Sequence, residues 1–283
     1  MDGMSLVGST DRTIWTPLVD PPGQIPSGGR ERSIFTSVDG SFTCGFWERE
    51  PDTWSFERPY DEVAYILEGS AGIETDDGRE LQVGPGDVLV TPNGSKGTWR
   101  IRQTLTKLYA IYSGAPIGDT DVRVIGRDDP VDWVTLENPP GDTNAPGQEW
   151  YAWRNVDGRF STGVWQRVPE TGTFELEYHE IACFIDGDVD IETSDGLILR
   201  VGPGDVLVTP IGFQGRLASP HPRQEVLGGA PRVTRTARWI RRACPAPGRQ
   251  ASPGPERGRC CYVGCAGAAR AAGTAGSSRP GCA

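Results

Sequence analysis

Histidine and lysine are scarce in this chain. Its 283 residues include two histidines, His179 and His221, and two lysines, Lys96 and Lys107. Imidazole is the commonest transition-metal ligand, so a site built from several histidines is excluded. No run of 18 apolar residues occurs, and so we expect no membrane-spanning segment. The first residues lack the basic and apolar segments of a signal peptide, and we therefore expect a cytoplasmic protein.

Cysteine and basic residues are also rare until the last quarter of the chain. Of seven cysteines, only Cys44 and Cys183 precede residue 217, and isolated thiols of this kind are typical of reduced, partly buried residues. The net charge is -10, but residues 217–283 hold 11 arginines and two acids. The preceding part therefore carries 17 basic and 36 acidic residues. Such an acidic body repels nucleic acid and anionic membranes, so we expect neither as a partner.

One decapeptide, VGPGDVLVTP, stands at residues 83–92 and again at 201–210. When the chain is compared with itself at an offset of 118 positions, residues 15–97 align with 133–215 without a gap. About half of the aligned positions are identical. A period of this length is too long for a solenoid repeat and suits a small domain. The sequence is therefore two copies of one domain.

Each copy consists of short strand-forming segments separated by turns. In the repeated decapeptide, a Gly-Pro-Gly reversal and an aspartate precede a buried strand. No segment keeps a helical period over three turns. Apolar runs or alternating patterns typical of strands occupy residues 62–69, 71–83, 88–90 and 98–112. The pattern predicts an all-β protein with one antiparallel sandwich or barrel in each copy.

The spacing of glutamate, glycine and proline in both copies resembles the two motifs of the cupin superfamily. The first motif, E-x6-G, is followed by GxGD and PxG, and the copies of E-x6-G stand at Glu62–Gly69 and Glu180–Gly187. The pattern is closer still to the cupin domain of the (S)-ureidoglycine aminohydrolase type, and it is similar to the barrel of ethanolamine-utilisation cupins. This resemblance implies two tandem antiparallel, jelly-roll-like cupin barrels that pack as a pseudo-dimer within the chain.

The second copy stops before its last strands. Where the period requires a counterpart of TWRIRQTLTKLYAIY (98–112), the chain reads RLASPHPRQEVLGGA. A one-base shift of the codons permits a reading W-R-H-P-T-P-V-K-K-F-W-A-V, which restores the strand pattern. We interpret the rest as out-of-frame translation after a frameshift near residue 216, with a purposeful disordered basic tail as the alternative.

These observations give a domain plan. We expect an N-terminal arm at 1–31, a first cupin barrel at 32–115, a linker at 116–149, a second barrel without its closing strands at 150–217, and an aberrant tail at 218–283.

The resemblance also implies where a metal would bind. Metal-binding cupins present H-x-H before the first-motif glutamate and another histidine after PxG. Here the corresponding stretches read Ser55–Asp61 and Thr173–His179, and glycine stands at the second-motif histidine in both copies. Because only Glu62 and Glu180 remain, we predict no metal and no other cofactor. Glu177 and His179 would share one face of a strand, so a weak metal site there is the alternative to a surface or interface histidine.

A small-molecule pocket is expected in the first barrel. Glu62 lies in an apolar strand and needs a partner if it points inward, and Lys107 in the closing strand is the candidate. An internal ion pair that only fixes strand register is the equal alternative. The other candidate ligand-binding residues are Trp47, Tyr65, Trp99, Lys96 and Glu180.

Three functions are consistent with this pocket. The first is binding of a small polar metabolite without established catalysis. The second follows from the resemblance: a hydrolase or isomerase acting on a ureido or amino-acid-like compound, with Glu62 as general base and Lys107 as electrostatic partner. The third is a structural or regulatory bicupin whose barrels only dimerise. A homo-oligomer of the whole chain stays open in each case.

Overall fold

The computed structural model describes residues 5–7, 16–17, 28–136, 147–166, 172–184 and 186–217. Every regular element among them is a strand, which confirms the predicted all-β class. This part of the chain has no helix long and apolar enough to cross a membrane. The predicted tail lies outside the described residues.

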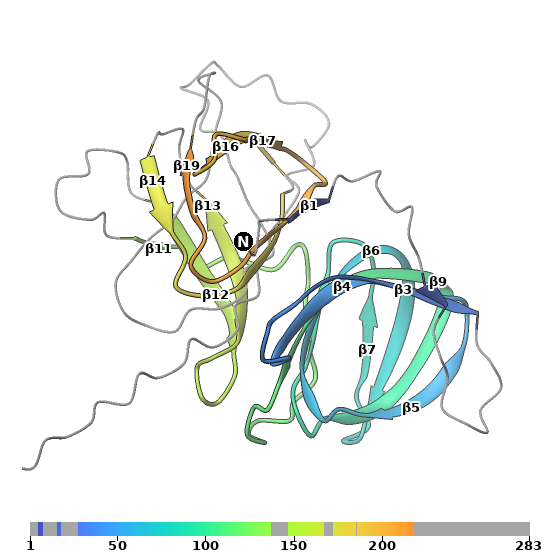
Figure 1. Ribbon diagram of the computed structural model, residues 1–283. Helices are drawn as coiled ribbons and strands as arrows, with labels where there is room; N and C mark the ends of the chain where they lie inside the picture. The colour runs from blue at the N-terminus through green and yellow to red at the C-terminus, as the bar shows by residue number, and fades with distance from the viewer. Residues whose placement is uncertain are drawn as a thin grey trace, which may run out of the picture.

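The first copy forms an antiparallel barrel whose strands belong to one sheet, drawn in blue to green in Figure 1. Its strands are β3 (Gly29–Thr36), β4 (Phe42–Arg49), β5 (Thr53–Glu57), β6 (Tyr60–Thr75), β7 (Glu80–Val83), β8 (Val88–Thr91) and β9 (Lys96–Ser113). The long strands β6 and β9 pair with each other along most of their length. The register of this pairing shifts between Ile66 and Ala71. Buried apolar side chains around Trp99, Ile66 and Leu105 fill the interior at one end.

The second copy repeats the order of the strands, which in its described residues lie in three smaller sheets. Its strands are β12 (Gln148–Arg154), β13 (Ser161–Gln166), β14 (Gly172–Glu175), β15 (Glu180–Cys183), β16 (Val189–Thr193), β17 (Ile198–Val201), β18 (Val206–Thr209) and β19 (Gln214–Leu217). Glu180 pairs with Thr209 as Glu62 pairs with Thr91, one period earlier. The copies therefore share one register, which confirms the duplicated barrel. The described part of the second barrel ends with β19, which corresponds only to the beginning of β9.

The repeated decapeptide forms the same turn twice. Gly86 and Gly204 both have φ of +91°. This is a left-handed conformation that residues with a Cβ rarely adopt. Asp87 and Asp205 accept a backbone N–H of the turn, from Gly84 and Gly202, at 2.9 Å each. Identical backbone demands therefore explain why the decapeptide is retained unchanged in both copies.

The leading strands of the two copies are exchanged. Strand β1 (Ser5–Val7) precedes the first copy but pairs with β18 of the second barrel. Strand β10 (Arg123–Ile125) lies one period after β1. It precedes the second copy but pairs with β8 of the first barrel. Figure 1 shows β1, in dark blue, beside the orange strands. The segments expected to be an arm and a linker thus each complete a sheet of the more distant barrel.

Two shorter strands stay with their own copies. Strand β2 (Thr16–Pro17) pairs with β3, and β11 (Val134–Thr135) pairs with β12. They too are one period apart, so the repeat extends to the segments outside the barrels.

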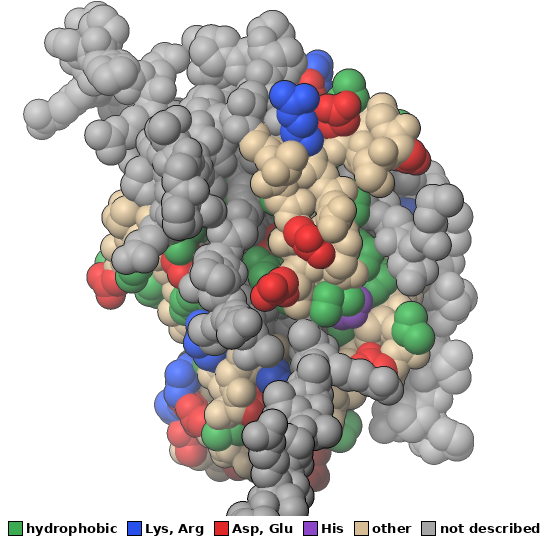
Figure 2. Space-filling view, turned by 60° about the vertical axis from the view of Figure 1, so that its left-hand side comes forward, with side chains coloured by type: hydrophobic (Ala, Val, Ile, Leu, Met, Phe, Trp, Pro, Cys, Tyr) green, Lys and Arg blue, Asp and Glu red, His purple; other side chains and the backbone are tan. Residues whose placement is uncertain are grey.

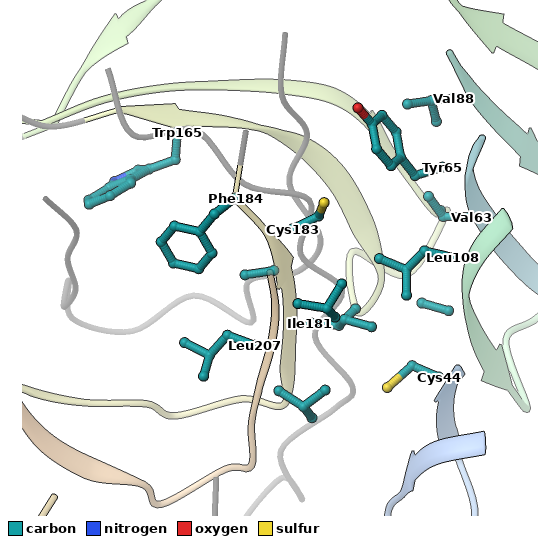
Figure 3. Packing of buried hydrophobic residues seen from close by; sticks show 14 of the residues in the cluster. Cys44, Val63, Tyr65, Val88, Leu108, Trp165, Ile181, Cys183, Phe184 and Leu207 are labelled. Atoms are coloured by element: carbon teal, nitrogen blue, oxygen red, sulfur yellow. The ribbon is translucent and has the colours of Figure 1, made fainter. Parts of the chain in front are cut away.

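One apolar core joins the two barrels. Figure 3 shows Cys44 and Leu108 of the first copy facing Ile181 and Cys183 of the second. Both cysteines are free, buried thiols, as the sequence predicts. Burial raises the pKa of Cys183 to about 12 and raises the pKa of Cys44 further, so neither forms a thiolate at neutral pH.

The contact between the barrels has approximate two-fold symmetry. Asp61 and His179, one period apart, occupy matching positions. The backbone N–H of Asn93 donates to Asp61 Oδ1 at 2.8 Å, and that of Ile211 donates to His179 Nδ1 at 3.1 Å. Each side chain also meets the other copy, because Asn155 Nδ2 donates to Asp61 Oδ2 at 3.0 Å and the His179 ring lies near aromatic rings of the first copy.

Exposed charges are largely paired across strands. Arg30 Nε lies 2.7 Å from Glu48 Oε1, and Arg102 Nη2 lies 3.0 Å from Glu80 Oε1. On the described part of the face drawn in Figure 2, acidic and basic side chains form small groups and no broad patch of one sign. Exposed pairs of this kind contribute about 1 kcal/mol or less each.

Candidate functional site

Glu62 and Lys107 form an ion pair inside the first barrel. Glu62 lies on β6 and Lys107 on β9, and the backbone of Lys107 pairs with Ile66, which shares a strand face with Glu62. Lys107 Nζ donates to Glu62 Oε1. Each side chain is only 5% exposed. The internal pair predicted from the sequence is therefore present.

Arg58 is a second cation on Glu62. Its Nη2 lies 3.2 Å from Glu62 Oε2, so each carboxylate oxygen faces a positive charge. Burial opposes ionisation of Glu62, but Arg58 and Lys107 outweigh it and hold the pKa of Glu62 below its usual value. Burial lowers the pKa of Lys107, while Glu62 acts in the opposite direction. Glu62 is accordingly a carboxylate at neutral pH.

These side chains line a cavity of about 240 Å³. Strands β3, β4, β5, β6 and β9 all contribute to its wall, and Arg58 comes from the turn between β5 and β6. The aromatic part of the wall consists of Trp47, Trp54, Tyr60, Trp99 and Tyr109, and the remaining lining residues are Glu31, Arg49, Arg58, Glu62, Lys107 and Ile111. The structure thus brings four sequence candidates together: Glu62, Lys107, Trp47 and Trp99.

The tryptophan rings of the wall are covered by cations of the chain itself. Lys107 Nζ lies 4.8 Å from the centre of the Trp47 ring and 5.6 Å from that of Trp99. The Arg49 guanidinium lies 4.2 Å from the centre of the Trp54 ring. Such cation–π contacts hold buried positive charge at low cost.

Glu31 and Tyr109 form a further polar pair on the wall. The Tyr109 hydroxyl donates to Glu31 Oε1. Burial and this hydrogen bond raise the pKa of Tyr109 far above its ordinary value, so the hydroxyl stays protonated. Sequence reasoning missed both residues and Arg58. The available signal was the repeat, because Glu31 has its counterpart in Glu149 one period later.

Two sequence candidates in the first barrel lie elsewhere. Tyr65 stands three positions from Glu62 on β6, so alternation turns it to the opposite face, where it packs in the core between the copies. Lys96 Nζ lies 2.9 Å from Glu57 Oε1 at the barrel surface, with its side chain 53% exposed. The structure therefore does not bring these two residues to the wall of the cavity.

The second barrel keeps part of this site. Glu180 is buried at the position that matches Glu62, and Glu149 and Trp165 match Glu31 and Trp47. Leu176, however, replaces Arg58, and the position of Lys107 falls beyond residue 217, outside the described residues. The two barrels therefore differ in the cations around the shared glutamate.

His179 belongs to the barrel interface. Its ring is stacked on Phe42 at 5.8 Å and 10°, and lies 5.1 Å from Phe35. Of the surface and interface positions expected for this residue, the structure shows the interface. Because Nδ1 accepts the N–H of Ile211, only Nε2 would be left for a metal.

The residues at the cupin motif do not fit the divalent metal that this fold often carries. In the described parts of the chain, no three His, Cys, Asp or Glu side chains gather as a metal site requires. Around Glu62 the nearest charged groups are Arg58 and Lys107, which compete with a metal for both carboxylate oxygens. The donor set at Glu62 therefore does not suit a divalent metal.

Comparison with known proteins places this geometry in a family. The EutQ-like cupin domain model matches residues 36–109 and 154–221, which together make up half of the chain. The chain belongs to the EutQ-like cupin family. Each barrel of this bicupin carries one match, in agreement with the duplicated fold.

A curated relative of the bicupin is the acetate kinase EutQ of Clostridioides difficile, which is 29% identical over 69 residues. The match covers 24% of this chain and 43% of that protein, so the chain spans less than half of the relative's length.

Two solved structures are similar over most of the bicupin. A Pseudomonas syringae protein of unknown function has a TM-score of 0.64 at 15% identity, covering 93% of this chain and 98% of that one. The putative glyoxylate-induced protein of Pseudomonas aeruginosa has a TM-score of 0.56 at 12% identity, covering 93% and 88%. At these identities the likeness shows the fold alone.

Proposed function

We propose that the first barrel binds a small polar metabolite in the cavity at Glu62 and Lys107. The observation that carries this proposal is the open volume of about 240 Å³ beside the buried charges of Glu62 and Lys107 and the partly buried charge of Arg58. Small-molecule sites are typically concave, rich in aromatic side chains and supplied with a few convergent polar groups. An ion pair that only fixed strand register would need no such cavity beside it.

A hydrolase or isomerase of the (S)-ureidoglycine aminohydrolase type is the weaker proposal. This proposal is supported by the resemblance of the sequence motifs to that family, and it requires Glu62 to act as the general base. A base needs a free lone pair directed at the substrate and a pKa near the working pH. Both oxygens of Glu62 face cations, and its pKa lies below the ordinary value. These features favour a fixed electrostatic role for Glu62 over proton transfer.

The test is a ligand screen on the full chain by thermal unfolding. A ligand that binds the folded state raises the melting temperature, and the rise grows with the logarithm of the ligand concentration relative to its Kd. We expect a small polar compound to do so without turnover, and ureidoglycine to release no ammonia. The rise should be lost in Glu62→Gln/Lys107→Met, which removes both members of the pair and so leaves neither of them buried alone.

The matched control is Lys96→Met, because Lys96 is the other lysine and lies outside the cavity. It should leave the ligand-induced rise unchanged. A screen in which no small polar compound stabilises the chain, or in which both variants lose the effect equally, would refute the proposal.

A further inference from the structure

We infer that the ligand presents an oxyanion, such as a carboxylate, to hydrogen-bond donors of Trp99 and Arg58. This inference rests on the proposed function and adds the chemical class of the ligand. It is drawn from the polar atoms of the wall that have no partner within the chain.

The first observation is Trp99. The residue is fully buried on β9 and lines the cavity, yet its Nε1 has no hydrogen-bond partner. A buried donor without a partner is costly, and most buried donors in folded proteins have one. The Nε atom of Arg58 is also buried without a hydrogen-bond partner, although the two terminal nitrogens of Arg58 contact Glu62 and Tyr60. Both unpartnered atoms are donors, so the ligand should supply acceptors.

The second observation excludes a cationic ligand. A cavity walled by tryptophan and tyrosine beside two carboxylates has the composition of a cage for alkylammonium ions. Here Lys107 and Arg49 already lie on the rings of Trp47, Trp99 and Trp54. Both oxygens of Glu62 are likewise taken by cations of the chain. An incoming cation would meet positive charge at the places where such a cage would hold it.

The third observation is the balance of charge on the wall. Three lining residues are cations, Arg49, Arg58 and Lys107, and two are carboxylates, Glu31 and Glu62. Arg49 is compensated by Asp52, which stands outside the wall and lies 2.9 Å from its Nη2. The other lining charges, Arg58 and Lys107 against Glu31 and Glu62, balance, so the preference for an anion rests on the unpartnered donors. Hydrogen bonds from charged or buried donors to an anion are the stronger kind.

The experiment is isothermal titration of the full chain with matched probes at constant ionic strength. Formate, acetate and glycolate are compared with their uncharged amides, with tetramethylammonium, and with nitrate and phosphate. We expect carboxylates to bind at least tenfold more tightly than their amides, and tetramethylammonium not to bind. Nitrate or phosphate binding in place of the carboxylates would support the oxyanion and identify an inorganic source.

Two variants test the donors. Trp99→Phe removes the N–H but keeps an aromatic ring, and it should weaken carboxylate binding at least tenfold. Its control is Trp153→Phe, a buried tryptophan of the second barrel. Arg58→Leu should abolish the preference for carboxylate over amide, and the fold accommodates leucine there because Leu176 holds the matching position in the second copy.

The outcomes distinguish a failure of the oxyanion inference from a failure of the proposed binding function. If amides or tetramethylammonium bind more tightly than carboxylates, or if Trp99→Phe binds carboxylates as well as the parent chain, the inference is wrong and the cavity remains a binding site. If no probe binds and no other small polar compound stabilises the chain, both fail.

Discussion

Lys107 is the residue on which the buried charge of the first barrel most depends. Replacing it with alanine leaves Glu62 with Arg58 as its remaining partner in a site that is 5% exposed. Removing one member of a buried pair leaves the other charge poorly compensated, so Lys107→Ala should cost about 3 kcal/mol of unfolding free energy. Urea denaturation measures this loss.

The double variant Glu62→Gln/Lys107→Ala should recover part of that stability, because no buried carboxylate is left unpaired. Lys96→Ala, which removes an exposed lysine, should change stability by about 0.5 kcal/mol or less. A Lys107→Ala chain as stable as the Lys96→Ala chain would contradict this account.

His179 makes stability depend on pH. Burial between the barrels lowers its pKa from the ordinary 6.5, although Asp39 acts in the opposite direction. As the pH falls through 6.5, the unfolded chain takes up this proton before the folded chain does, so the contribution of His179 to stability is present above that pH and declines below it. Protonation also removes Nδ1 as the acceptor of the Ile211 N–H.

The check is the unfolding free energy at pH 7.5 and 5.5 for the parent chain and for His179→Gln. The fall in stability between the two pH values should be smaller in the variant. An equal fall in both chains would show that other groups control the dependence.

Single residues also show what the sequence could and could not reveal about the site. Glu62 and Lys107 were predictable because a carboxylate in an apolar strand needs a partner and lysine is rare. Arg58 was not, because it lies in a turn whose side-chain direction follows no period. Tyr65 was expected in the pocket with Glu62. However, it stands three positions after Glu62 on one strand, and strand alternation turns its side chain to the opposite face.

Among the elements, the repeated turn before β8 and β18 has the strictest requirement. Gly86 has φ of +91°, and alanine there is strained whatever space surrounds it. Gly86→Ala should therefore cost about 1–3 kcal/mol. Gly84→Ala is the matched control, since Gly84 lies in the same turn with no such φ and only Asp87 at 3.9 Å from an added Cβ.

Thermal or urea unfolding of the two variants compares them directly. The pair should differ by at least about 1 kcal/mol, with Gly86→Ala the less stable. Equal stability would mean that the turn relaxes into another conformation.

The elements also divide the fold into what could be predicted and what could not. The strands, turns and duplicated barrels follow from alternation, glycine positions and the repeat. The pairings of β1 and β10 do not, because pairing between strands far apart in the chain depends on tertiary contacts. The sequence of a three-residue strand does not by itself determine which barrel the strand pairs with.

At the scale of the whole molecule, the two barrels should behave as one unit. They share an apolar core and exchange β1 and β10. If a protease site is inserted within residues 137–146 and cleaved, the two fragments should remain together under native conditions, because strand pairing and the core hold them. Size-exclusion chromatography of the cleaved chain measures this.

The control is a chain that is cleaved only after residue 217, because this cut reduces the mass without separating the two barrels. Fragments that separate in native buffer would show that the covalent connection, and not the shared core, holds the barrels together.

The exchange of β1 and β10 also bears on ancestry. In a homodimer of single barrels, each subunit could lend its leading strand to the other, and two identical swaps would arise from one sequence. Joining two such genes end to end reproduces the arrangement of this chain without any new contact. The chain thus holds, within one polypeptide, the strand exchange that such a homodimer would make between two. Its copies are no longer equivalent, because Leu176 stands where the first copy has Arg58.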